Sequence, residues 1–123
     1  RDLAALATPN AECADGRAAI QVHRSFNRPA KPKTPAVERL ALAARRAAED
    51  LGQPLPFAAT GGVCDGNIMQ DAGLPTIDTL GVRGGGLHTP EEWIELPSLV
   101  ERCQLLALLI ARISTGAERV VDS

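Results

Sequence analysis

The last long segment of the chain, residues 98–115, constrains the fold most, because it is apolar over most of the circumference of a helix. Its apolar residues recur at helical spacing: Leu99, Val100, Cys103, Leu106, Ala107, Leu109, Ile110 and Ile113. A helix of this kind is predicted to be heavily buried, with Cys103 as part of its packing. Ser98 and Glu101 have the spacing of a capping box, and Gly116 lies just beyond the helix.

A second helix is predicted over residues 35–51. Its apolar residues form a stripe that is rich in alanine: Val37, Leu40, Ala41, Ala44, Ala47, Ala48 and Leu51. Thr34 has the position of an N-cap, and Gly52 follows the last helical residue. Alanine side chains are small, so this helix is expected to approach a sheet or another helix closely.

Shorter elements lie between these two helices. Residues 55–59 and 75–80 are predicted to be buried strands, the second because its threonines and isoleucine favour extended backbone. A short helix is predicted over residues 66–71, with Asp65 as its N-cap. Helices that alternate with strands predict an α/β fold in which the helices pack on a short sheet.

Composition and charge exclude several classes of function. The chain has 123 residues, enough for one domain with a core, and a formal net charge of -2. Its basic residues are dispersed and aromatic residues make up only 2%, so neither a nucleic-acid site nor binding to an anionic membrane is predicted. The apolar run 105–111 is too short to span a bilayer, which takes about 20 residues.

The cysteines give no sign of a metal knuckle or a disulfide framework. Cys13, Cys64 and Cys103 are an odd number without a CxxC pair. The chain also shows no signal peptide, so the expected location is a reducing cytoplasm.

One of the two histidines, His88, directly follows the glycine run 84–86 and one leucine. Thr89, Pro90 and Glu92 then have the positions of N-cap, first residue and capping-box partner of a helix. His88 would therefore lie at a rigid junction, and a metal ligand needs such a position because its ring nitrogen must point one way. Considered alone, the same pattern also fits a loop histidine without a partner.

Four motifs succeed one another from residue 61 onward. They are the turn Gly61-Gly62-Val63-Cys64-Asp65-Gly66, the strand entry Ala72-Gly73-Leu74-Pro75, the loop Leu80-Gly81-Val82-Arg83-Gly84-Gly85-Gly86-Leu87-His88, and the apolar last helix. In order and spacing they resemble the C-terminal segment of the M20 family of metal-dependent amidohydrolases and carboxypeptidases, most of all its glutamate carboxypeptidase-like members. Asn27-Arg28-Pro29 resembles the Arg-Pro at the hinge into the family's catalytic domain. The resemblance covers about residues 18 to 116.

The resemblance implies a domain organisation. Residues 1–27 would be the end of an inserted dimerisation domain, 28–35 a hinge linker, 36–116 the C-terminal part of the catalytic domain and 117–123 a tail. The fold would then be part of a zinc-exopeptidase-like catalytic domain, with a remnant of the dimerisation domain at the N-terminus. The chain begins with Arg1 and not with Met, which indicates an engineered boundary, a processing site or a proteolytic cut. The resemblance implies that it is the C-terminal third of a longer, homodimeric enzyme.

The resemblance also assigns roles to five residues. His88 corresponds to the family's last metal ligand and would hold one of two zinc ions of a full-length active site. Arg28 corresponds to the arginine that grips a substrate carboxylate, for which a guanidinium offers a bidentate fork; a solvated linker arginine is the alternative. Gly62 and Val63 would belong to a rim loop, and Gly85 to a loop close to the substrate, although a plain flexible loop fits the glycine run equally well.

Other reactive residues receive no catalytic role. Cys64 and Val63 depart from the family pattern: the family usually has Ser or Thr where this chain has Cys64, and often Gly where it has Val63. A nucleophilic Cys64 would need a base, and no histidine is near it in sequence. Glu91, Glu92 and Glu95 are explained by helix capping and solvation, and the family's general base is a glutamate upstream of this chain.

The predicted function is therefore that of a metal-dependent hydrolase. The parent enzyme would cleave an amide or peptide bond next to a free carboxylate, in a small peptide or an N-acyl amino acid, through a metal-activated water. The chain alone is predicted to be inactive and to lack zinc. The alternative is a non-catalytic α/β interaction or dimerisation module that offers a strand at residues 18–26 to a partner.

Overall fold

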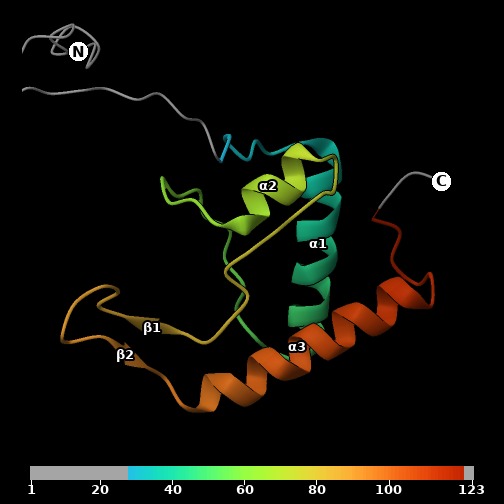
Figure 1. The fold of residues 1–123 in the computed structure, drawn as a ribbon. Helices are drawn as coiled ribbons and strands as arrows, with labels where there is room; N and C mark the ends of the chain where they lie inside the picture. Colours follow the sequence, from blue (N-terminus) through green and yellow to red (C-terminus); the bar gives the residue numbers. More distant parts are fainter. Residues whose placement is uncertain (1–27, 121–123) are drawn as a thin grey trace, which may run out of the picture.

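The computed structural model describes residues 28–120 of the chain. These residues form the helices α1 (Pro35–Asp50), α2 (Asp65–Asp71) and α3 (Pro97–Ser114), and the strands β1 (Gly84–Gly85) and β2 (Trp93–Ile94). Figure 1 shows α1 standing on α3, with α2 beside the upper part of α1 and the β1–β2 hairpin beside the start of α3. The described architecture is thus a small helical layer with a short antiparallel hairpin attached.

Local signals explain where α1 begins and ends. The hydroxyl of Thr34 accepts a hydrogen bond from the backbone N–H of Val37 at 3.3 Å, and Pro35 occupies the first helical position. At the other end Leu51 is the C-cap and Gly52 has a positive φ of 65°. The predicted helix over residues 35–51 is confirmed to within one residue.

The core lies where α1 meets α3. It consists of six buried apolar residues: Ala43, Ala44, Ala47, Ala48, Leu105 and Leu109. The four alanines come from α1 and the two leucines from α3, so small side chains on one helix receive large ones from the other. The predicted close approach of the alanine face is confirmed, and its partner is a helix.

The prediction that α3 is heavily buried is wrong for the described part of the chain. Its face with Leu105 and Leu109 is buried, whereas Ile110 is 63% exposed and Cys103 is exposed as well. Leu99, Val100 and Leu106 also have large exposed fractions. The physical reason is that α1 covers one side of α3, and no other helix or strand among residues 28–120 covers the opposite side. None of the described helices is long and apolar enough to cross a membrane.

The predicted strands at residues 55–59 and 75–80 are also wrong in this structure. Both segments are assigned to no strand, and β1 and β2 form the one sheet found within residues 28–120. The segments are instead held by side chains, since Leu55 and Ile77 pack against the core and the guanidinium of Arg45 lies 3.7 Å above the ring of Phe57. The helices therefore pack on each other and not on a sheet of these strands.

The predicted helix after Thr89 is wrong, because a turn and strand β2 take its place. The hydroxyl of Thr89 donates to the carbonyl of Gly86 at 2.7 Å, which bends the chain back on itself. Residues 93–94 then pair with β1 in an antiparallel register, Gly84 opposite Ile94 and Gly85 opposite Trp93. Pairing with the glycine run therefore extends the backbone at a position where the capping residues alone favour a helix.

Candidate functional site

The hairpin loop fixes the backbone around His88. The N–H of Thr89 donates to the carbonyl of Gly86 at 3.1 Å, alongside the bond from the Thr89 hydroxyl, and the N–H of Glu92 donates to the carbonyl of Thr89 at 3.2 Å. Both Gly86 and His88 adopt a positive φ, 68° and 66° respectively. A left-handed conformation is uncommon for a residue with a side chain, so the turn imposes it on His88. The imidazole is exposed on this turn.

The glycine run is required by close packing within the hairpin. A Cβ on Gly84 would lie 2.3 Å from the carbonyl oxygen of Trp93, and a Cβ on Gly85 would lie 3.0 Å from its indole nitrogen. Glycine is therefore the residue that lets β1 and β2 approach each other. This gives Gly85 a structural role in place of the plain flexible loop, while its predicted contact with substrate stays a prediction.

Arg83 joins the hairpin to the start of α3. Its guanidinium donates to Glu95 at 2.7 and 2.9 Å and to Glu101 at 2.5 Å, and its backbone N–H donates to the hydroxyl of Ser98 at 2.9 Å. Hydrogen bonds from Arg83 lower the pKa of Glu95 below its usual range. The predicted capping box of Ser98 with Glu101 is wrong, because Arg83 engages both residues. Glu95 pairs with Arg83 as well, while its side chain stays 43% exposed to solvent.

The described residues do not by themselves make a zinc site. Across residues 28–120 no group of three or more His, Cys, Asp or Glu side chains is placed to hold a metal ion. His88 thus offers one exposed nitrogen ligand, whereas zinc sites in enzymes use three protein ligands. Within residues 28–120 His88 therefore supplies one ligand of such a site, and the other ligands would have to come from outside this part of the chain.

A second group of polar residues surrounds the start of α2, where Arg28 meets Asp65. The Nη2 atom of Arg28 lies 2.8 Å from Oδ1 of Asp65, with both side chains largely exposed. Asp65 is the first residue of α2, and the N-cap is Cys64, whose backbone N–H donates to Oδ1 of Asn67 at 3.0 Å. The prediction that Asp65 caps this helix is wrong, because the ion pair with Arg28 engages its carboxylate.

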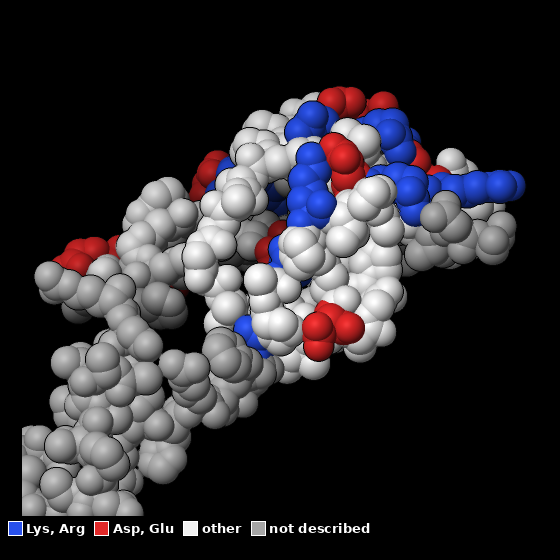
Figure 2. Space-filling view, turned by 90° about the horizontal axis from the view of Figure 1, so that it is seen from above, with Lys and Arg blue, Asp and Glu red and all other residues white. Residues whose placement is uncertain are grey.

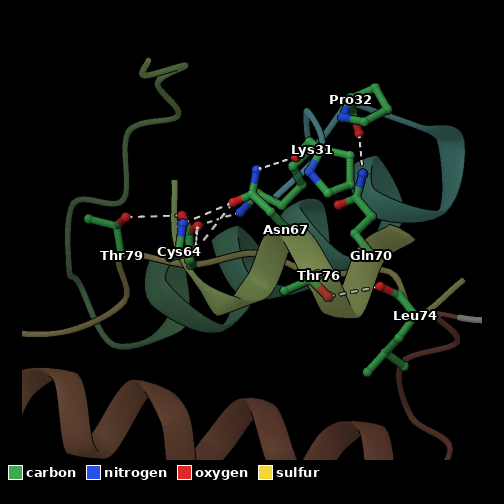
Figure 3. A network of polar contacts seen from close by, with 10 residues as sticks. Lys31, Pro32, Cys64, Asn67, Gln70, Leu74, Thr76 and Thr79 are labelled. Carbon is green, nitrogen blue, oxygen red and sulfur yellow. Dashed lines mark hydrogen bonds and ion pairs between the residues drawn. The ribbon is translucent and has the colours of Figure 1, made fainter. Parts of the chain in front are cut away.

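Asp78 accepts hydrogen bonds from three donors beside this helix. Its Oδ2 accepts from the thiol of Cys64 at 2.9 Å and from the ammonium of Lys31, and its Oδ1 accepts from the hydroxyl of Thr79 at 3.0 Å. Figure 3 shows this network together with the side chains of α2 that point toward residues 29–32. The bonds from the thiol and the ammonium lower the pKa of Asp78 from 3.8 to about 2.

Lowering the pH should therefore weaken this network by protonating the carboxylate of Asp78. Its folded pKa lies below the unfolded value, so its stabilising effect is complete above about pH 4 and is lost as the pH falls toward about 2. In Asp78→Asn the urea midpoint should be lower at pH 7 and should change less between about pH 5 and pH 2.5 than in the wild type. The side chains of Lys31 and Asp78 are 18% and 43% exposed, so the effect should stay within about 1 kcal/mol.

The control for this measurement is Glu91→Gln, which removes a carboxylate from the exposed hairpin loop. Its urea midpoint should track the wild type at both pH values. An Asp78→Asn protein with the same pH dependence as the wild type would contradict the assignment of the acid transition to Asp78.

The predicted rim residues Gly62 and Val63 lie in the exposed loop just before α2. Val63 is 57% exposed, and a Cβ on Gly62 would meet nothing closer than the Thr60 hydroxyl at 3.8 Å. In the view of Figure 1 this loop and the hairpin loop that carries His88 both project to the left of α1. The site residues thus fall into two groups, one around α2 with Arg28 and one on the hairpin.

Charge on the surface is mixed in sign. On the face seen in Figure 2, Lys and Arg lie among Asp and Glu, next to a broad area with neither type. Elsewhere in the described chain Arg46 pairs with Glu118 at 2.5 Å and Arg112 with Asp50. The basic side chains of these pairs are therefore matched by neighbouring carboxylates.

A comparison with known protein families shows to which family the chain belongs. The family model of peptidase family M20/M25/M40 matches residues 8–112, which is most of the chain. The chain belongs to this family. Comparison with curated proteins returned no match, and neither did comparison with solved structures. Membership makes the chain a relative of metallohydrolases, with three helices and a short antiparallel sheet as the described part of its M20 domain.

The structure adds site residues that the sequence analysis did not single out. Lys31, Asn67, Asp78 and Arg83 each form side-chain bonds that hold a loop with a predicted site residue. Asn67 also has a local signal, since its side chain bonds the N-cap Cys64 three residues before it. The bonds of these residues to distant loops span 12 to 47 positions, and no local pattern marks those. The predicted dimerisation-domain segment 1–27, with its strand at 18–26 and Cys13, lies outside the described residues, as do residues 121–123 of the predicted tail.

Proposed function

We propose that this chain is the C-terminal part of a metal-dependent hydrolase that cleaves an amide or peptide bond next to a free carboxylate. The observation that carries the proposal is the M20 match over residues 8–112, which includes the turn that fixes His88. In this proposal residues 36–116 belong to a zinc-exopeptidase-like catalytic domain. Residues 28–35 form the hinge, and 1–27 end a dimerisation domain of a homodimeric, cytoplasmic parent.

His88 supplies one metal ligand in the proposed enzyme. Its backbone is held by the bonds between Thr89 and Gly86, so its Cα–Cβ bond leaves the hairpin in a fixed direction. The remaining ligands and the general base would come from a segment that precedes this chain in the parent. Zinc bound there would act as a Lewis acid and lower the pKa of a bound water.

Arg28 binds the substrate carboxylate in the proposed enzyme. Within residues 28–120 its guanidinium is bonded to Asp65 through Nη2, and the side chain is 45% exposed. The remaining N–H donors can therefore form a bidentate pair with a carboxylate from solution. Gly62 and Val63 in the loop before α2, and Gly85 in the hairpin, would lie along the substrate, which is a small peptide or an N-acyl amino acid.

The first test is the coding sequence upstream of the Arg1 codon. An open frame with a His-x-Asp motif and then Glu-Glu supports the proposal, because it supplies the missing ligands and the general base. An upstream frame without these motifs contradicts it. Residues 1–123 expressed alone should show no zinc-dependent hydrolysis, and measurable hydrolysis would contradict the assignment of the missing groups to the preceding segment.

The second test is His88→Ala in the longer protein. Loss of one ligand should reduce zinc affinity by about 100-fold or more, and the zinc content after dialysis should fall with hydrolytic activity. Leu87→Ala is the matched control, since Leu87 is the neighbouring residue and is 70% exposed on the same loop. Zinc content that is the same in both variants would contradict the role of His88.

One observation favours the second candidate, a non-catalytic interaction module. The exposed side of α3 carries Leu99, Val100, Leu106 and Ile110, an apolar surface that a partner could cover. The same upstream sequence separates the two candidates, because an interaction module needs neither His-x-Asp nor Glu-Glu.

A further inference from the structure

The hinge residues 29–32 are tied to α2 by side-chain bonds. Nδ2 of Asn67 donates to the carbonyl of Pro29 at 2.8 Å, and Nε2 of Gln70 donates to the carbonyl of Pro32 at 2.5 Å. Asn67 and Gln70 are three residues apart on one face of the helix, and the two prolines are three residues apart in the hinge. Figure 3 shows both amides pointing from α2 toward this segment.

Side-chain donors from α2 bond this segment because its prolines offer no backbone donors of their own. Pro29 and Pro32 have no backbone N–H, so this stretch lacks two of the donors that a strand or turn would use. Their carbonyls remain strong acceptors, and the one that most needs a partner is that of the half-buried Pro29, since Pro32 is exposed to water. The amides of Asn67 and Gln70 provide it.

Asn67 is the centre of this attachment. It is only 4% exposed, and both ends of its amide are used. Oδ1 accepts from the N–H of Cys64 at 3.0 Å, which caps α2, while Nδ2 donates to Pro29. One side chain thus connects the start of α2 to the hinge, and a flip of the amide would break both bonds at once.

The hinge residue next to Pro29 is Arg28. Its guanidinium reaches Asp65 at 2.8 Å, and Asp65 lies two residues before Asn67 in α2. The helix therefore fixes both ends of this arginine: its backbone through Pro29 and its side chain through Asp65. Lys31 and Asp78 secure the same hinge on its other side.

We propose that Asn67 is the positioning residue for Arg28, holding the hinge on α2 so that the guanidinium faces the substrate carboxylate. The proposal rests on the proposed function, which gives Arg28 its ligand. Asn67 touches no substrate itself. It acts by keeping the arginine in the geometry that a bidentate pair requires.

Asn67→Asp isolates this role from the stability of α2. An aspartate has nearly the same shape and keeps an oxygen for the N–H of Cys64, so the helix cap is retained. It loses the donor to Pro29 and places a negative oxygen against that carbonyl. The hinge should therefore lose its attachment at Pro29 while the helix remains.

The test compares two substrates in the longer enzyme: a peptide with a free terminal carboxylate and the same peptide as its carboxamide. Asn67→Asp should lower the ratio of their kcat/KM values, carboxylate over carboxamide, by up to about 100-fold, mainly through KM. Arg28→Ala should lower the ratio by a similar factor, and adding Asn67→Asp to it should change the ratio no further. Met69→Ala, an exposed position on α2, should leave the ratio unchanged.

The outcomes separate this inference from the proposed function. A ratio that Arg28→Ala lowers and Asn67→Asp does not would overturn the role of Asn67 alone. A ratio that Arg28→Ala does not lower would refute the carboxylate part of the proposed function. An equal fall for both substrates in Asn67→Asp would mean a merely structural role and would overturn the inference.

A second measurement uses residues 1–123 directly and needs no activity. Backbone heteronuclear NOE values of residues 28 and 30, which flank Pro29, should fall in Asn67→Asp because the bond to the Pro29 carbonyl is lost, while those within α2 should stay near the wild type. Hinge values that stay unchanged would overturn the inference, whether or not the longer enzyme can be purified.

Discussion

Leu105→Ala should remove most of the stability of this chain. Leu105 is fully buried, and the other buried apolar residues are four alanines and Leu109. A Leu→Ala change in a core costs about 2–5 kcal/mol, and whole domains have only about 5–15 kcal/mol. The side chains of the neighbouring alanines are too short to fill the cavity, so the loss of folding free energy should lie toward the upper end of that range.

Urea unfolding monitored by circular dichroism measures this effect. The control is Leu106→Ala on the same helix, where the side chain is 38% exposed and the same atoms are deleted. Its loss should be about half of that at Leu105 or less, because less surface was removed from water in the first place. Equal losses in the two variants would mean that α3 does not pack on α1 through Leu105.

The ends of α1 and α3 could be predicted because their signals are local. Thr34 and Pro35 mark the start of α1 within two residues of sequence, and the alanine stripe shows which side another element approaches. The observed α3, Pro97–Ser114, differs from its predicted bounds by one residue at each end. Capping and periodicity act within a few residues, so one sequence suffices to read them.

The burial of α3 could not be predicted in the same way. Its composition says that an apolar surface needs a cover, but not which element provides it. In the described chain α1 covers the side of Leu105, and Ile110 on the other side is 63% exposed. Composition therefore predicted the right helix and a wrong environment for Cys103.

Local sequence patterns mark only part of the candidate site, for a related reason. Local patterns mark the turn at His88 and the predicted hinge at Arg28. In the structure His88 has a positive φ in a hydrogen-bonded turn, and Arg28 is paired with Asp65. The bonds from Asn67 to Pro29 and from Lys31 to Asp78 join residues 38 and 47 positions apart. No rule of spacing pairs residues at such separations, so only the folded chain reveals that α2 holds residues 29–32.

Gly84→Ala should disrupt the hairpin and, with it, the position of His88. The added Cβ would lie 2.3 Å from the carbonyl oxygen of Trp93, a backbone atom that no side-chain rotation can move away. The strands must separate, which breaks the pairing of Gly85 with Trp93 and displaces the loop between them. Overpacking of this kind costs about 1–3 kcal/mol. The near-ultraviolet circular dichroism of Trp93, the only tryptophan, should decrease.

Gly81→Ala is the matched control, because a Cβ there meets no atom within 4 Å. Its stability should stay within about 0.5 kcal/mol of the wild type, and its tryptophan signal should be unchanged. In the longer protein Gly84→Ala should also lower zinc retention, as His88→Ala does, whereas Gly81→Ala should not. If Gly84→Ala loses the tryptophan signal and keeps its zinc, the hairpin is a structural element that does not position a ligand, and His88 is a loop histidine without a metal.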